Sequence, residues 1–485
     1  MNGTARLETE WLFAVPGSRP PLHRAALDIV DGRIAAITEN AQGGRGRAAM
    51  PALVNAHDHG RGLRSVAFGA FDQPLEAWVA SLRLVPGVDL YTNCVVAFGR
   101  LALSGVSAIS HVHIPGGGDT VEEAMAVARA ARDVGVRVAY ALPVVDANAF
   151  VYGGPSRFCS CHNPVDWAVA QGWDGRPETA MAQMERVDAV ASACQSPIFT
   201  VQYGPAGPQW VTEAGLRNLA ERSAADGRRI HMHLLESTTQ RQWSDRHYPG
   251  GLLAHLDALG LLSPALTVAH CVWLTDAEID LLAARGATAV VNTSSNLRLS
   301  SGVAPVRRFA NRGLRFAFGL DGLAFNDDED ALFELRLMSS LHGPRGFADP
   351  GVDRSAMWRA ATADGRFTID GHEDTGRLDA GADADIMVID VAALAADGVA
   401  ELCDPLDLIM TRAARRHVSD LYVAGRHVVS DHRLTGVDLD AAERELVAAA
   451  RAAAGTSIAE APLMRRHLAA IGAYYRDGRH LEGRD

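Results

Sequence analysis

Two histidines separated by one residue are the first candidates for chemistry in this chain. His57 and His59 directly follow the apolar run 51–54, which predicts a short buried strand. Residues two apart on a strand point to the same side, so both imidazoles would project from the strand end into one small volume. Nitrogen ligands in that arrangement suit a divalent metal ion. A lone His-x-His pair also occurs by chance, so further ligands must decide.

Four more side chains suited to metal binding or acid–base chemistry stand at the ends of predicted strands. His233 and then Glu236 end the fifth strand, His270 ends the sixth, and Asp321 follows the eighth. Each alone has a structural explanation, since such histidines are often core residues, Asp-Gly is often a turn, and Glu236 could cap a helix. Their joint appearance at strand ends is much harder to obtain by chance.

The elements that would position these residues repeat regularly along the chain. After the strand that carries the first His-x-His pair, buried strands are predicted at 107–113, 136–144, 197–203, 229–235, 266–270, 287–292 and 314–320, with amphipathic helical stretches such as 121–133, 178–194, 213–225 and 276–285 between them. Eight strand–helix units predict an α/β fold with a (β/α)8 barrel, also called a TIM barrel. In such a barrel the active site lies at the carboxyl ends of the strands, where these histidines and carboxylates would converge.

The segments on either side of the barrel have a different pattern. Residues 1–50 and 376–437 contain short alternating strands with tight turns, which predicts one small β-sandwich domain built from both chain ends. The barrel would occupy residues 51–375, and residues 438–485 are expected to form a helical tail. Residues 145–177, rich in Gly, Pro and Trp, do not fit the repeat and are expected to be an inserted loop on the catalytic face.

Composition excludes several classes of function. The 485 residues carry 46 basic and 58 acidic side chains, for a net charge of −12, which disfavours nucleic acid and anionic membranes as partners. All 46 basic residues are arginine, so an amine nucleophile and a carboxylated lysine bridge are excluded. No secretion signal and no apolar run near the roughly 20 residues of a membrane span occur. We expect a cytoplasmic protein whose six scattered cysteines are reduced.

The motifs taken together resemble the amidohydrolase superfamily. Within it, they are similar to the aminohydrolase and chlorohydrolase branch, which includes guanine, cytosine and S-adenosylhomocysteine deaminases and triazine hydrolases. The resemblance covers nearly the whole chain, and its motifs are Pro-Ala-Leu-Val-Asn-Ala-His-Asp-His at 51–59, His-Met-His-Leu-Leu-Glu-Ser at 231–237, Ala-His at 269–270, the segment 292–305, Gly-Leu-Asp-Gly at 319–322, Gly-Arg-Leu at 376–378 and Ala-Asp at 384–385.

The resemblance implies a metal-dependent deaminase. One divalent ion, zinc or alternatively iron, would be held by His57, His59, His233 and Asp321, with Glu236, His270 and Asp321 acting in catalysis. The expected reaction replaces an exocyclic amine of a nitrogen heterocycle by oxygen and releases ammonia. Alternatives at the same site are loss of chloride or an alkylamine from a triazine and hydrolysis of a cyclic amide. An alternative of another class is a catalytically silent binding protein. A homo-oligomer is expected.

The sequence departs from the family pattern near the expected substrate pocket. After the fourth strand many purine-nucleoside deaminases carry His-Ala-Pro-Tyr, whereas residues 202–210 here read Gln-Tyr-Gly-Pro-Ala-Gly-Pro-Gln-Trp. A Cys-Pro pair common in the family is replaced by Asn-Thr-Ser at 292–294. We therefore expect a compact, largely neutral ring rather than an adenosine-type substrate. The side chains expected to contact it are Gln202, Tyr203, Trp210 and His113.

Two further motifs resemble metal sites. His111 and His113 form a second His-x-His pair, but the family pattern has no ligand on the second strand, so His111 is interpreted as structural. Cys159, Cys161 and His162 resemble part of a zinc knuckle. No second ligand pair follows them at a suitable spacing, so a loop with free thiols is the preferred interpretation.

Overall fold

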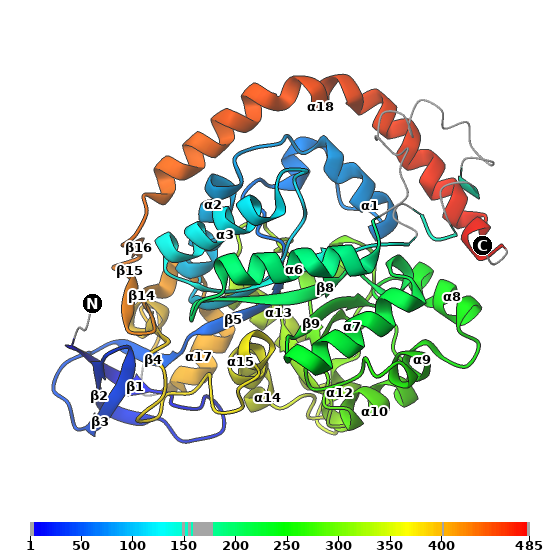
Figure 1. The fold of residues 1–485 in the computed structure, drawn as a ribbon. Helices are drawn as coiled ribbons and strands as arrows, with labels where there is room; N and C mark the ends of the chain where they lie inside the picture. Colours follow the sequence, from blue (N-terminus) through cyan, green and yellow to red (C-terminus); the bar gives the residue numbers. More distant parts are fainter. Residues whose placement is uncertain (1–3, 148–150, 154–156, 159–177, 400–401, 483–485) are drawn as a thin grey trace.

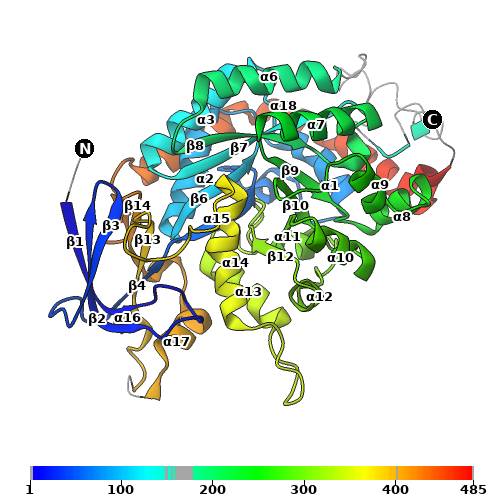
Figure 2. The same cartoon turned by 60° about the horizontal axis from the view of Figure 1, so that its bottom comes forward.

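A barrel of eight parallel strands forms the body of the molecule (Figures 1 and 2). The computed structural model describes residues 4–147, 151–153, 157–158, 178–399 and 402–482. The barrel strands are β5 (Leu53–Asp58), β6 (Val106–Val112), β7 (Arg137–Val144), β8 (Phe199–Pro205), β9 (Ile230–Leu234), β10 (Leu266–His270), β11 (Thr288–Val291) and β12 (Arg315–Phe318). The segment after β12 meets β5, where Leu320 N–H donates to Asn55 Oδ1 (3.0 Å) and Asp321 N–H donates to the His57 carbonyl (2.9 Å). The predicted barrel is confirmed.

Helices surround this sheet. They include α1 (Leu75–Ser81), α2 (Leu90–Leu103), α3 (Thr120–Val134), α6 (Ala180–Cys194), α7 (Glu213–Asp226), α8 (Thr238–His247), α9 (Leu252–Ala258), α10 (Asp276–Ala284), α11 (Thr293–Arg298), α12 (Val306–Asn311), α13 (Ala331–His342), α14 (Arg354–Ala361) and α15 (Ala363–Asp370). Their ends follow from local sequence. Asp119 accepts hydrogen bonds from two first-turn N–H groups of α3, which ends at Gly135 in the left-handed conformation (φ 100°).

A second sheet combines strands from both ends of the chain. Its order is β16-β15-β14-β13-β4-β1-β2-β3. The strands are β1 (Thr4–Leu12), β2 (Leu22–Val30), β3 (Arg33–Glu39), β4 (Arg47–Pro51), β13 (Ile386–Asp390), β14 (Val418–Val423), β15 (Arg426–Ser430) and β16 (Arg433–Leu434). The prediction of a domain from both chain ends is confirmed, but its strands form one mixed sheet rather than a two-sheet sandwich. The reason is that β4 pairs with β1 on one side and with β13 on the other.

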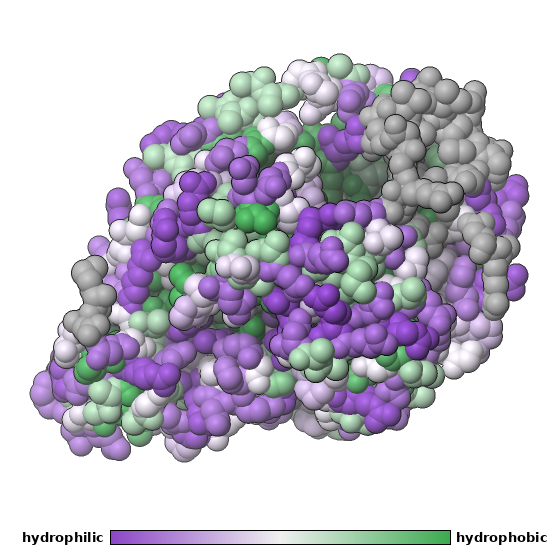
Figure 3. Space-filling model, viewed as in Figure 1, coloured by the Kyte–Doolittle hydropathy of each residue, from purple (hydrophilic) through white to green (hydrophobic). Residues whose placement is uncertain are grey.

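The longest helix, α18 (Leu439–Arg476), follows the second sheet and arches over the side of the barrel formed by α2 and α1 (Figure 1). Leu446 and Ala450 pack with Leu63 and Val96 in one buried cluster. The space-filling view shows apolar side chains in a recess beneath this arch (Figure 3). None of the helices in the described ranges has the length and apolar character needed to cross a bilayer.

Candidate metal centre

Five side chains meet at the carboxyl ends of four barrel strands. His57 and His59 lie on and just after β5, His233 on β9, His270 on β10 and Asp321 after β12. The possible ligand atoms of His57, His233 and His270 lie within 4.8 Å of one another, as do those of His57, His59 and Asp321. Asp321 Oδ1 lies 3.4 Å from His57 Nε2 and 3.1 Å from His59 Nε2. The structure brings together the four predicted ligands, with His270 beside them.

The second ring nitrogens show that these imidazoles fit a metal ion. Nδ1 of His59 lies 2.9 Å from the Val112 carbonyl, and Nδ1 of His233 lies 2.7 Å from the Ala206 carbonyl. A carbonyl accepts only, so each Nδ1 carries the proton and each Nε2 keeps its lone pair. This is the arrangement in which protein histidines bind metal ions, because the backbone fixes both tautomer and ring orientation.

The charge state of the cluster also suits a cation. Burial lowers the pKa of His57 and of His233 well below the usual value, which keeps both rings neutral. Burial alone would raise the pKa of Asp321, but the adjacent His57 and His59 outweigh it and hold that pKa well below its usual range. The centre therefore offers neutral nitrogen ligands and one anionic oxygen.

A further histidine supports His57 from behind. Nδ1 of His57 lies 2.7 Å from Nε2 of His231, whose own Nδ1 lies 3.1 Å from Ser110 Oγ. With the lone pair of His57 on Nε2, its Nδ1–H donates to His231, and His231 in turn donates to Ser110. Sequence reasoning gave His231 no role. The signal was its position two residues before His233, which places both side chains on the same side of β9.

Asp58, between the two ligand histidines, holds the loop after β5. Its carboxylate accepts hydrogen bonds from Asn55 Nδ2 (2.7 Å), the N–H of Gly60 (2.6 Å) and the N–H of Gly322 (3.1 Å). Gly322 directly follows Asp321. Asp58 therefore ties the loop that carries one pair of ligands to the loop that carries the carboxylate ligand.

Asp321 occupies a left-handed backbone conformation (φ 62°) that is uncommon for residues other than glycine. Arg61 Nη1 donates to the Asp321 carbonyl, and Ser295 Oγ donates to its Oδ2 (2.5 Å). His270 is also left-handed (φ 72°). Such conformations persist only where neighbours over-determine them, and they concentrate at functional sites.

Glu236 lies beside this cluster and contacts His270, which is not one of the four predicted ligands. Its Oε2 is 3.5 Å from Nε2 of His270, and its Oε1 accepts a hydrogen bond from Ser301 Oγ (3.2 Å). Nδ1 of His270 lies 2.9 Å from Asn296 Oδ1, which fixes the ring. Burial raises the pKa of Glu236 to about 7, although His270 opposes the shift. A carboxyl in this position can hold or release a proton near neutral pH.

These groups form the floor of a cavity of about 400 Å³. His59, His233, Glu236, His270 and Asp321 line the floor. The wall is mainly apolar and includes Leu75, Trp78, Val79, Leu82, Val112, Ile114, Pro115, Pro143, Val145, Tyr152, Trp210, Leu299 and Tyr475, with Arg61, Glu76 and His113 as polar members. A concave apolar pocket with a few convergent polar groups is typical of a small-molecule site.

A sequence comparison decides the family. The model of the amidohydrolase family matches residues 48–428, which include the whole barrel and, of the second sheet, nearly all of β4, all of β13 and β14 and part of β15. The chain belongs to the amidohydrolase family. The predicted superfamily is thereby confirmed.

This amidohydrolase is similar to several deaminases. A 5′-deoxyadenosine deaminase of Methanosarcina barkeri is 27% identical over 352 residues, 70% of this chain and 72% of the relative. A 5-methylthioadenosine/S-adenosylhomocysteine deaminase of Nitratidesulfovibrio vulgaris is 29% identical over 458 residues, 90% of this chain and 93% of the relative. The crystal structure of an adenosine deaminase from Xanthomonas campestris with bound zinc is 22% identical, with a TM-score of 0.75, covering 92% of this chain and 98% of that one.

Two of the four residues expected to contact substrate lie away from the pocket of this amidohydrolase. Gln202 is buried, and its Nε2 donates to the carbonyl of Thr368 (2.9 Å). The Tyr203 hydroxyl donates to Asp226 Oδ2 (2.7 Å). The physical reason is that β8 runs to Pro205 rather than ending at Tyr203, so Gly204 and Ala206 line the cavity instead. The structure therefore does not support Gln202 and Tyr203 as substrate contacts.

Trp210 and His113, the other two, do line the cavity. Nε2 of His113 lies 2.7 Å from Glu123 Oε2. His111 is buried between the rings of Phe98 and Tyr140, as its structural interpretation implies. Sequence reasoning missed Arg61, Glu76 and Tyr475 in the wall, because nothing in their local pattern distinguishes them from ordinary surface or core residues.

The Cys159-x-Cys161-His162 motif and most of the predicted insert 145–177 lie outside the described residues.

Proposed function

We propose that this amidohydrolase is a hydrolytic deaminase that replaces the exocyclic amine of a purine or a related nitrogen heterocycle by oxygen. The supporting observation is the position of Glu236, a buried carboxyl at the floor of an apolar cavity beside the histidine and aspartate cluster. Hydrolysis at a ring carbon next to nitrogen needs an activated water and a proton donor for that nitrogen, and this floor offers groups for both tasks.

We further propose that the cluster holds one divalent ion, zinc or alternatively iron, through His57, His59, His233 and Asp321. When bound, such an ion lowers the pKa of a water molecule from 15.7 towards about 7. A single ion is expected because this chain has no lysine to form a carboxylated bridge between two ions.

The side chains then divide the work. Asp321 and His270 accept and orient the proton of the attacking water. As the water oxygen forms its bond to the ring carbon, Glu236 delivers a proton to the neighbouring ring nitrogen. The carbon–amine bond then breaks, and the amine leaves as ammonia with the proton that Asp321 and His270 took from the water. The remaining proton on the oxygen passes to Glu236 as the carbonyl forms. The Glu236 carboxyl serves as acid and then as base, which a residue in contact with His270 and Ser301 is placed to do.

The cavity suits a ring that carries an uncharged substituent. The proposed substrate is therefore larger than the bare ring that the sequence led us to expect. Its volume of about 400 Å³ lies within the usual range for drug-sized ligands, and the wall above the floor is mainly apolar. Glu76 lies in this wall and could accept a hydrogen bond from a sugar hydroxyl. We propose a purine nucleoside with an uncharged 5′ group as the preferred substrate. The apolar wall supports this choice, and 5′-deoxyadenosine and 5-methylthioadenosine, which have such groups, stand in the names of the two relatives.

A screen for ammonia release tests this function. Zinc-loaded protein would be assayed with adenine, guanine, adenosine, 5′-deoxyadenosine, 5′-methylthioadenosine, S-adenosylhomocysteine, cytosine, a pterin and a chlorotriazine. We expect the highest kcat/KM with an uncharged 5′-substituted adenosine. No ammonia from any substrate would contradict the proposal, and release of chloride alone would favour the triazine reaction. A preference for free adenine would restore the bare-ring expectation.

Metal content separates the two His-x-His pairs. Elemental analysis should give about one equivalent of metal in the wild type. His57→Ala should lose the metal, whereas the matched control His111→Ala should keep it. Two tightly held equivalents that both support activity, or an empty site in folded His111→Ala, would overturn this assignment.

A further inference from the structure

The active-site cavity has one wall residue from the distant C-terminal helix. Tyr475, in the last turn of α18, lines the same cavity as Glu236 and His270. The end of α18 packs against α1, where Ile471 and Tyr474 share a buried cluster with Ala77. The arch of α18 in Figure 1 therefore carries its last turn to the mouth of the barrel.

Two consecutive tyrosines of α18 hold a second wall residue, Tyr152, by its backbone. The Tyr475 hydroxyl accepts a hydrogen bond from the Tyr152 N–H (3.1 Å), and the Tyr474 hydroxyl donates to the Tyr152 carbonyl (2.9 Å). The rings of Tyr152 and Tyr475 meet edge to face, with centroids 5.5 Å apart. Both peptide groups of Tyr152 are thus satisfied by the C-terminal helix.

The Tyr152 side chain continues this connection towards the floor of the cavity. Its hydroxyl donates to Glu76 Oε1 (3.4 Å), which also accepts from the hydroxyl of Ser237 (2.5 Å). Ser237 directly follows Glu236. A chain of contacts therefore runs from Tyr475 through Tyr152, Glu76 and Ser237 to the neighbour of Glu236 in the sequence.

From this geometry we propose that Tyr475, together with the Tyr152 that it holds, determines specificity for the ring substituent. This inference rests on the proposed function. Tyr475 is a specificity residue and not a catalytic one, because its hydrogen bonds connect it to Glu236 through Tyr152, Glu76 and Ser237 rather than directly. Its contribution is apolar and aromatic surface, which favours an uncharged group at the far end of the substrate.

Steady-state kinetics of Tyr475→Ala test the proposal. We expect the KM for 5′-deoxyadenosine to rise by about tenfold with little change in kcat, because the lost contact binds ground state and transition state equally. The KM for adenine, which has no substituent, should be unchanged. Tyr475→Phe keeps the ring but loses the bond to Tyr152, so it should show a smaller rise of the same kind and serves as the test if the alanine variant does not fold.

Leu446→Ala is the matched control, because Leu446 is buried on the same helix, packs with Leu63 and Val96, and is not among the residues that line the cavity. It should lower stability and leave both KM values unchanged. Equal rises for adenine and 5′-deoxyadenosine in Tyr475→Ala, or the same rise in Leu446→Ala, would show a general loosening and overturn the proposal.

Acrylamide quenching of tryptophan fluorescence separates failure of this inference from failure of the proposed function. Trp210 packs on Tyr152 (centroids 5.8 Å apart) and lines the cavity. Quenching should increase in Tyr475→Ala and not in Leu446→Ala. Unchanged quenching would refute the wall role whatever the reaction is. Increased quenching without turnover of any purine would refute only the deaminase proposal.

Discussion

Glu236 offers the sharpest test among single residues. Glu236→Gln keeps the shape of the side chain and much of its hydrogen bonding but cannot exchange a proton. We expect a folded protein that keeps its metal and loses at least about a hundredfold in kcat, in line with lost acid–base catalysis. Turnover and elemental analysis on the same sample measure this. Near-normal kcat in the metal-loaded variant would remove Glu236 from the mechanism and weaken the case for ring deamination.

A variant of His231 tests whether the hydrogen bond to the metal ligand His57 strengthens metal binding. His231→Phe removes the acceptor that lies 2.7 Å from His57 Nδ1 and so frees the orientation and tautomer of that ring. Loss of such partners typically weakens metal binding by about 10- to 100-fold, and we expect a change of this size. Competition with a chelator measures the affinity, with Ser110→Ala as a milder control. Unchanged affinity in His231→Phe would show that the protein core alone orients His57.

The sequence predicts which histidines and which aspartate the structure brings together, but it predicts the lining of the cavity poorly. His57 and His233 could be found because each stands at the end of a strand that the sequence pattern identifies, together with its place in the order of barrel strands. Gln202 could not be placed, because a two-residue difference in where β8 ends decides which side chains reach the cavity. Tyr475 could not be found at all, since the path of α18 across the barrel depends on long-range packing.

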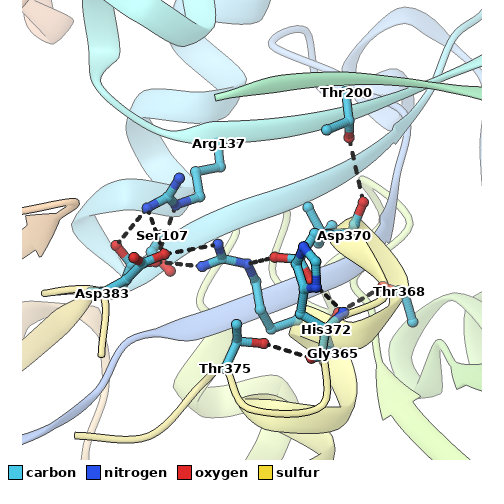
Figure 4. A network of polar contacts seen from close by, with 12 residues as sticks. Ser107, Arg137, Thr200, Gly365, Thr368, Asp370, His372, Thr375 and Asp383 are labelled. Carbon is cyan, nitrogen blue, oxygen red and sulfur yellow. Dashed lines mark hydrogen bonds and ion pairs between the residues drawn. The ribbon is translucent and has the colours of Figure 1, made fainter. Parts of the chain in front are cut away.

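At the scale of elements, an ion-pair cluster joins the second sheet to the barrel face opposite the active site. Arg137 begins β7, Arg366 lies on α15, and Asp385 precedes β13. Asp385 accepts from Arg137 Nε (3.1 Å), Arg366 Nη1 (2.5 Å) and the N–H of Ala424 (2.6 Å). Figure 4 shows Arg137 and Asp383 in this network. This face, at the amino ends of the barrel strands, serves the stability of a barrel rather than its chemistry.

Asp385→Asn should destabilise the protein most at neutral pH. Burial would raise the pKa of Asp385, but Arg137 and Arg366 outweigh it and lower that pKa. Its stabilisation is therefore complete above the ordinary aspartate pKa of about 3.9 and is lost as the pH falls through the folded value. Breaking such a buried pair costs about 3 kcal/mol. We expect the difference in unfolding free energy from the wild type to be about this size at pH 7 and to shrink below about pH 4.

Urea unfolding at several pH values measures this difference. Asp397→Asn is the control, because Asp397 pairs with Arg412 on the surface and should leave stability unchanged. A difference for Asp385→Asn that stays constant down to acid pH would mean that its charge is not what stabilises the junction.

The prediction of the second domain shows where element patterns stop being informative. The alternation of apolar and polar residues, together with turn residues between them, identified its strands at both chain ends. They could not show that β4 bridges the two groups, pairing in parallel with β1 and antiparallel with β13. The choice between one mixed sheet and a sandwich depends on the pairing of strands more than 300 residues apart, and the local sequence of a strand does not indicate such a partner.

At the scale of the whole molecule, the barrel and the second sheet share continuous structure. Ala52 alone separates β4 of the second sheet from β5 of the barrel, and its N–H donates to the Asp385 carbonyl (3.0 Å). One hydrophobic cluster includes Met50 and Met387 of the second sheet together with Ile109 and Val138 of the barrel. Neither part can open without exposing apolar surface and charged groups of the other.

We therefore expect the barrel and the second sheet to unfold together. Far-UV circular dichroism, which follows mainly the barrel helices, and hydrogen exchange at β13, which reports on the second sheet, should give coincident transitions in urea. The shared cluster, the Asp385 junction and the direct passage from β4 to β5 all oppose independent opening. Loss of protection at β13 before the helices melt would contradict this, because it would show that the second sheet is a separable domain. The Asp385→Asn protein is the informative comparison, since weakening the junction should move the β13 transition ahead of the barrel transition if the junction is what couples them.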